Sequence, residues 1–159
     1  MNKHLHDETV YRVATDTLES LALMFLVPEE EAANPLPPCS RRVAVKFTGP
    51  FEGMLILAAS ESVLPALAAN MLGLENDSLP TTDQQEDALK ELVNVVCGNL
   101  LPAIAGKEPI FHIDAPQVLV VEQAHSTGNL LQAGQARLLA DSGVLELSFF
   151  VDQFSPAST

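Results

Sequence analysis

The fold of this chain is decided largely by one stretch, Asp87-Ala-Leu-Lys-Glu-Leu-Val-Asn-Val-Val-Cys-Gly-Asn99. Residues three and four positions apart share one face of a helix. The polar residues at this spacing are Asp87, Glu91, Asn94 and Gly98. The apolar residues that point elsewhere, toward a core, are Leu89, Leu92, Val93, Val96, Leu100 and Ile104. The stretch therefore predicts a helix that covers a core and presents one polar stripe.

Two residues of the stripe need a reason. Asn is a mediocre helix former because its amide competes with the backbone, and Asn94 stands between Val93 and Val95. Its amide is explained either by a local hydrogen bond or by a ligand or partner. Gly98 costs about 1 kcal/mol relative to Ala inside a helix. It either permits close approach of another backbone or relieves a clash with Pro102. The simplest alternative for Glu91 and Asn94 is an ordinary exposed helix face.

The segments before this stretch read as a helix, a hairpin and a short helix. Asp7 to Val27 has helical apolar spacing, and Asp7 can cap its start. A Pro-rich loop comes next. Strands at 43–48 and 54–59 flank the turn Gly49-Pro-Phe-Glu-Gly53 and predict a hairpin. Ser60 or Ser62 can then cap a short helix that runs to Met71 and stops at Gly73.

The long helix and the strands after it complete the fold. Thr82 with Gln85 predicts a capping box at its start, and Pro102 predicts a kink or an end. Three strand candidates come next: part of Ile110 to Val121, Leu130 to Ala140, and Val144 to Val151. The predicted order is α-β-β-α-α-β-β-β. Segregated helices and strands like these favour an α+β sandwich, with helices packed on a mostly antiparallel sheet.

Composition bounds the class of protein. The 159 residues suit a single domain, 1–159, and 47% of them are apolar, as in a globular chain. Eight scattered Lys and Arg against a net charge of -13 exclude the basic footprint of a nucleic-acid binder. The N-terminus lacks the apolar run of a signal peptide, and the longest apolar runs are too short to span a membrane. We expect a cytoplasmic protein.

The other reactive side chains show no site pattern. Cys39, in the Pro-rich loop, and Cys97, in the helix, are expected to be free thiols. The four histidines show no metal-ligand spacing with either cysteine, so we expect no metal site in this chain.

The combined pattern resembles the CheC/CheX/FliY family of phosphatases that act on chemotaxis response regulators. In that family an Asp or Ser is followed by Glu, then Asn, then a distant Pro. Here these are Asp87, Glu91, Asn94 and Pro116, twenty-two residues after the Asn. The resemblance extends from about Val43 to Val121 and includes the turn at 49–53. It implies a CheX/CheC-like fold.

The resemblance also implies a reaction, in which a receiver domain's aspartyl phosphate is hydrolysed by water. Asn94 would orient that water, because a neutral carboxamide does not repel the phosphoryl oxygens. Glu91 would pair with the receiver's active-site Lys. We assign Asp87, peripherally, and Gly98 to the partner-binding surface. The partner would be a phosphorylated CheY-like response regulator, and its receiver domain would supply the Mg²⁺.

A partial internal repeat indicates which members of the family the chain resembles most. Thr15 and Glu19 echo Asp87 and Glu91, but Ala22 stands where the Asn would be. One intact site resembles CheX more than two-site CheC proteins, and CheX likeness implies a homodimer, for which Val144 to Val151 could present an edge. Two alternatives remain: a non-catalytic CheX-like module that binds a receiver or another signalling partner, and a structural part of a flagellar switch.

Overall fold

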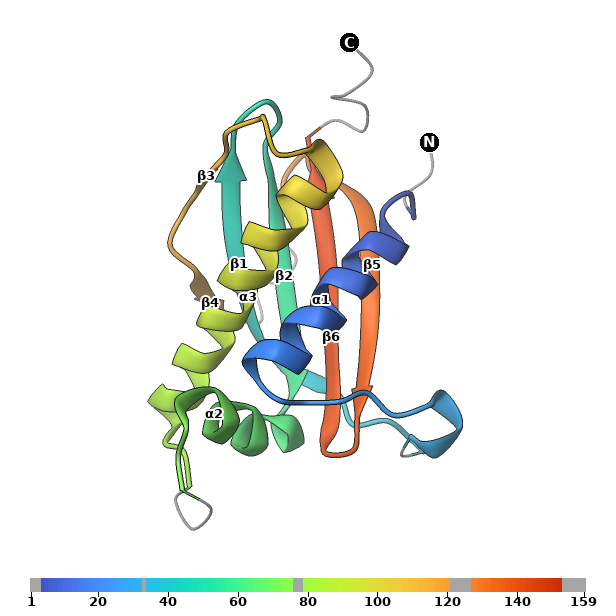
Figure 1. Ribbon diagram of the computed structural model, residues 1–159, viewed down its shortest axis with the longest axis vertical. Coiled ribbons are helices and arrows are strands. Elements are labelled where there is room, and N and C mark those ends of the chain that lie inside the picture. Colours follow the sequence, from blue (N-terminus) through green and yellow to red (C-terminus); the bar gives the residue numbers. More distant parts are fainter. Residues whose placement is uncertain (1–3, 33, 76–78, 121–126, 153–159) are drawn as a thin grey trace.

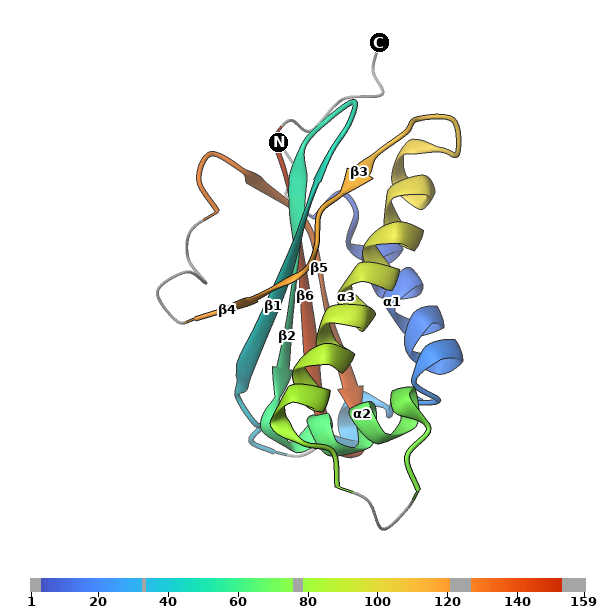
Figure 2. The same cartoon turned by 90° about the vertical axis from the view of Figure 1, so that its left-hand side faces the viewer.

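The computed structural model of the chain describes residues 4–32, 34–75, 79–120 and 127–152. Within these residues, three α-helices lie against one face of a six-stranded sheet (Figures 1 and 2). The helices are α1 (Asp7–Leu21), α2 (Leu64–Leu72) and α3 (Thr82–Ala105), with short 3-10 turns η1 (Glu29–Glu31) and η2 (Glu61–Val63). The strands are β1 (Cys39–Thr48), β2 (Gly53–Ser60), β3 (His112–Ile113), β4 (Gln117–Leu119), β5 (Leu131–Ala140) and β6 (Gly143–Val151).

The sheet confirms the predicted α+β sandwich. Its order is β3-β1-β2-β6-β5, β4 also pairs with β1, and every pairing is antiparallel. The predicted hairpin β1–β2 is present, and the last two strand candidates pair with each other as β5 and β6. The candidate strand in Ile110 to Val121 is two short strands, which pair in succession with the same side of β1.

The edge predicted for the strand at Val144 to Val151 is wrong. These residues belong to β6, which lies between β2 and β5 and has both sides paired. It therefore presents no free edge, and the predicted homodimer loses this support. β5 is the last strand on that side of the sheet.

The main core lies between the helices and the sheet. Alternate residues of the central strands point toward the helices, since successive side chains of a strand face opposite sides. Phe47 of β1 and Phe149 of β6 stack there, with ring centroids 5.9 Å apart. From α3 come eight buried residues: Ala88, Leu89, Leu92, Val93, Val96, Cys97, Leu100 and Leu101. The inward face predicted for this helix is confirmed.

The first helix is shorter than its periodicity predicts, because it ends at Leu21 and not at Val27. Past this end, at Leu26 and Val27, the backbone pairs with β5 and does not continue the helix. The Val27 N–H donates to the Leu139 carbonyl at 2.8 Å, and Leu26 forms a bridge with Ala140. The side chain of Asp7 is no cap either. It accepts from the Gln135 N–H at 2.8 Å and so ties α1 to β5.

Local assignments at the other helix starts also shift. The capping box of α3 uses Thr81 and Gln84, one residue before the predicted pair: the Gln84 N–H donates to Thr81 Oγ1 at 3.1 Å, and the Thr81 N–H to Gln84 Oε1 at 2.9 Å. Ser60 caps no helix, since its hydroxyl accepts from the Val144 N–H at 3.0 Å. The short helix starts at Leu64 and ends, as predicted, at left-handed Gly73 (φ 66°). Cys39 begins β1 and lies in no loop.

Candidate functional site

The polar stripe lies on the outer face of α3, away from the sheet. Asp87, Glu91, Asn94 and Gly98 are all exposed on this one helix. Leu92 and Val96, which alternate with them in sequence, are each 1% exposed. A separation of three residues places Glu91 and Asn94 about 4.5 Å apart along the helix axis. The helix thus presents a carboxylate and a carboxamide side by side to solvent.

The side chains of Glu91 and Asn94 are unpaired among the described residues. Neither makes a hydrogen bond or ion pair with any residue that the structure describes. The local hydrogen bond that was one explanation of Asn94 is therefore not formed within that part of the chain. Both groups are free there to contact water or a partner molecule.

Gly98 continues the exposed face one turn further. A Cβ built at this position meets no heavy atom within 4 Å outside the backbone of its own helix. Alanine would therefore meet no neighbouring side chain at this position. The clash expected from Pro102 involves the Gly98 carbonyl and not a Cβ, so that explanation of the glycine stays open. Helix propensity disfavours glycine here, and no packing contact within the described chain requires it.

Contacts at both ends hold α3 in place. Near its start, Arg41 Nη2 of β1 contacts Glu86 Oε2 at 3.0 Å. In its second half, Asn99 Nδ2 donates to Thr17 Oγ1 of α1 at 3.5 Å. Between these contacts the apolar face is packed in the core. The stripe is therefore carried by a rigid element, as a site that must orient a reacting group requires.

The two prolines of the region occupy different places. Pro102 lies inside α3, which continues for three residues and ends at Ala105, where the Gly106 N–H donates to the Pro102 carbonyl at 2.9 Å. The helix therefore runs through Pro102 and ends about one turn beyond it, later than the kink or end that the proline predicted. Pro116 immediately precedes β4, and both β3 and β4 lie beside α3. The chain segment that carries the distant proline thus returns alongside the helix of the stripe.

Cysteine and metal chemistry find no support in the described residues. Cys39 and Cys97 are free thiols, as predicted. Burial raises the pKa of Cys97 to about 12, and burial with nearby Glu146 raises the pKa of Cys39 to about 12. Both therefore stay protonated near neutral pH and are poor nucleophiles. No three His, Cys, Asp or Glu side chains converge in the part of the chain that is described.

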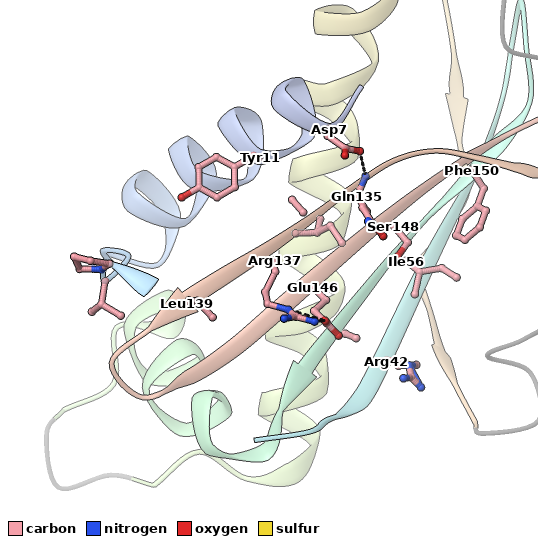
Figure 3. A pocket seen from close by; sticks show the side chains of 15 residues that line it. Asp7, Tyr11, Arg42, Ile56, Gln135, Arg137, Leu139, Glu146, Ser148 and Phe150 are labelled. Carbon is pink, nitrogen blue, oxygen red and sulfur yellow. Dashed lines mark hydrogen bonds and ion pairs between the residues drawn. The ribbon is translucent and has the colours of Figure 1, made fainter. Parts of the chain in front are cut away.

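A concave region, separate from the stripe, lies mainly on the opposite face of the sheet. This hollow, of about 950 Å³, is lined by alternate outward residues of β1, β2, β5 and β6 and reaches α1. Figure 3 shows Arg137 and Glu146 pointing toward one another in it, with Arg137 Nε 3.1 Å from Glu146 Oε2. Sequence reasoning missed these residues, although strand alternation was a signal that could have found them. The hollow is separated from the stripe by the sheet.

By length and composition, α3 is the one helix among the described residues that could cross a membrane. The core helix of a soluble protein passes the same test. Its apolar residues are packed against the sheet and the other helices, which accounts for its hydropathy.

Comparison with protein families gives a match over more than half of the chain. The family model described as "Chemotaxis phosphatase CheX" matches residues 42–132. This range includes the whole stripe and Pro116. No curated protein matches the chain by sequence.

Solved structures of similar fold include three that bear on the comparison. CheX from Vibrio vulnificus superposes with a TM-score of 0.68 at 15% identity, over 95% of this chain and 99% of that one. A CheX-CheY-BeF3-Mg+2 complex from Borrelia burgdorferi gives 0.65 at 17% identity, over 92% and 97%. Thermotoga maritima FliY gives 0.51 at 12% identity, over 90% and 88%. At these identities the structures show a shared fold.

Proposed function

This chain belongs to the CheX family, and from that premise we propose that it docks on a phosphorylated receiver domain and positions the water that hydrolyses its aspartyl phosphate. One observation carries the proposal: Glu91 and Asn94 are exposed one turn apart on α3, with no partner for either side chain among the described residues. These are the residues that match the family's Glu and Asn.

The chemistry needs little from the phosphatase itself. Water attacks phosphorus in line, the bond from phosphorus to the aspartyl oxygen breaks, and inorganic phosphate and a free carboxylate leave. Phosphoryl transfer depends on positioning and electrostatics, so one oriented water lowers the barrier. The carbonyl oxygen of Asn94 can accept a hydrogen bond from that water, and its neutral charge avoids repelling the phosphoryl oxygens.

Glu91 would set the docking register. A carboxylate one turn before Asn94 can pair with a lysine of the receiver, and charge-assisted hydrogen bonds of this kind are short and directional. Asp87, one turn earlier, would lie at the periphery of the contact. Gly98, one turn later, would let the receiver's backbone approach α3 closely, since a Cβ there would project into open space.

The Mg²⁺ of the reaction is assigned to the receiver. The stripe of this chain offers two carboxylates, Asp87 and Glu91, which lie about 6 Å apart along the helix. The described residues hold no cluster of three ligand side chains. A homodimer stays in the proposal through family likeness alone, because β6 has no free edge.

Asn94→Ala tests the proposal. The fold should be unchanged, since the site is exposed and Ala is the better helix former. Stimulated dephosphorylation should fall by about 10²-fold or more, because the water loses its orienting group. Phosphate release from a panel of phosphorylated receiver domains measures this, and binding of the same receivers should persist.

Asn99→Ala is the matched control, since Asn99 is an exposed asparagine on the same helix whose amide faces Thr17 of α1. It should release phosphate at close to the wild-type rate, because this hydrogen bond is long at 3.5 Å and the packed apolar face of α3 still fixes the helix without it. If the wild-type protein binds a receiver tightly yet accelerates no dephosphorylation, and Asn94→Ala changes nothing, the chain is a non-catalytic binding module.

A further inference from the structure

The turn that follows α1 displays apolar side chains to solvent. Leu23 is 64% exposed and Phe25 is 69% exposed, while Ala22 and Met24 on either side of Leu23 are buried in the core. We refer to Leu23 and Phe25 as the apolar turn. Two large apolar side chains are thus exposed within three residues of one turn.

The backbone at Leu23 is held in a costly conformation. Its φ of 54° is left-handed, and it is the one described non-glycine residue with a positive φ. Helices commonly end on glycine in this conformation, because a Cβ there is disfavoured. The conformation is imposed by its surroundings: the Ala22 and Met24 N–H groups both donate to the Leu18 carbonyl, at 3.0 and 3.2 Å. The result is a leucine side chain aimed at solvent where glycine would fit better.

Leu23 follows the end of α1 that lies level with the middle of α3. The two helices pack side by side and run in opposite directions (Figures 1 and 2). The Asn99–Thr17 hydrogen bond sets their register. Four residues from Thr17 to the helix end at Leu21 advance about 6 Å along α1, and four residues back from Asn99 reach Val95 on α3. The Met24 N–H donates back to the Leu18 carbonyl, so the turn at Leu23 stays at this end of α1. Leu23 is therefore level with the segment that carries Glu91 and Asn94.

We propose that Leu23 is an apolar anchor for the receiver domain that docks over Glu91 and Asn94. Such an anchor next to polar contacts is the usual anatomy of a specific protein interface. The partner surface it fits is an apolar patch on the receiver, adjacent to its phosphorylated aspartate and the lysine that meets Glu91. This inference rests on the proposed function, since it uses the same partner and the same site.

Leu23→Gly is the test, because glycine accepts the left-handed backbone and removes only the side chain. Its urea midpoint should equal or exceed that of the wild type. The KM for phosphorylated receiver should rise about tenfold from the lost apolar burial, with kcat unchanged, since Leu23 does not touch the water. Binding to a receiver treated with beryllium fluoride and Mg²⁺ should weaken by the same factor.

Ile110→Gly provides the control. Ile110 is 86% exposed and follows the opposite end of α3, so losing it should leave KM and kcat unchanged. Unchanged KM for Leu23→Gly, in an experiment where Asn94→Ala has lost activity, would overturn the anchor and leave the proposed function standing. A wild-type protein that neither binds nor dephosphorylates any receiver would overturn the proposed function, and the anchor with it.

Discussion

Helices α1 and α3 lie side by side on the same face of the sheet and carry related sequences, yet only α3 keeps a polar pair. Thr15 and Glu19 of α1 echo Asp87 and Glu91 of α3. In α3 the helix continues, and Asn94 projects into solvent one turn after Glu91. In α1 the helix has ended at Leu21, and Ala22 is 0% exposed. The difference shows that the third position of the pattern faces solvent only in α3, because there the helix continues past it.

Matched substitutions of the two glutamates should separate the helices most sharply. Glu91→Ala should weaken receiver binding by about 30-fold or more, since it removes one partner of a charged interfacial pair, and turnover should fall too. Glu19→Ala removes an equally exposed carboxylate at the equivalent position of α1 and should change binding by no more than about twofold. Calorimetric titration of a beryllofluoride-activated receiver measures both. Equal losses in the two variants would mean that net charge, and not this site, governs docking.

The comparison of α1 with α3 can also be tested by adding the missing Asn to the partial repeat of α1 and measuring the stability of the protein. Ala22→Asn restores the missing residue, but its side chain would enter the core. We expect a loss of about 2 kcal/mol in the free energy of unfolding, from overpacking and an unsatisfied buried amide. Urea denaturation gives this value. Added to the Asn94→Ala variant, Ala22→Asn should restore no phosphatase activity; any recovery would show that the end of α1 can turn outward.

Of these substitutions, Gly98→Ala should change the protein least. It should stabilise the fold, whereas Ala22→Asn should destabilise it. Alanine fits without contact and should raise the free energy of unfolding by about 1 kcal/mol. If the receiver backbone packs against Gly98, the same methyl group should weaken binding several-fold. Thermal unfolding and receiver titration would be measured together. A variant that is more stable and binds as the wild type does would leave Gly98 outside the interface.

The stripe and the architecture were accessible to sequence reasoning because they depend on local periodicity. A 3.6-residue period placed Leu92 and Val96 inward and Glu91 and Asn94 outward, and strand alternation around the turn at 49–53 predicted the β1–β2 hairpin. Glu91 and Asn94 themselves were chosen by spacing together with family likeness. Their roles in catalysis stay predictions, since exposure on a helix face does not by itself show a reaction.

The sequence predictions were wrong where two neighbouring residue pairs could form the same local motif, or where a distant strand bonded to a residue in place of its local partner. The duplicated Thr81-Thr82 and Gln84-Gln85 allow two capping boxes one residue apart, and the chain uses the earlier one. Asp7 has the chemistry of a cap but bonds to Gln135, more than a hundred residues away. Such choices depend on partners that a local pattern does not contain.

The sequence by itself determined the α+β class and the outward face of α3, because both follow from the spacing of neighbouring residues, and family likeness added the choice of Glu91 and Asn94. Only the tertiary structure decided that β6 is interior, that α1 stops at Leu21 and that Leu23 is turned to solvent after the end of α1. These features depend on backbone groups paired across the sheet, such as Val27 with Leu139. Long-range pairing outweighs a few tenths of a kcal/mol of helix propensity per residue, so it redirects the chain where periodicity alone would continue the helix.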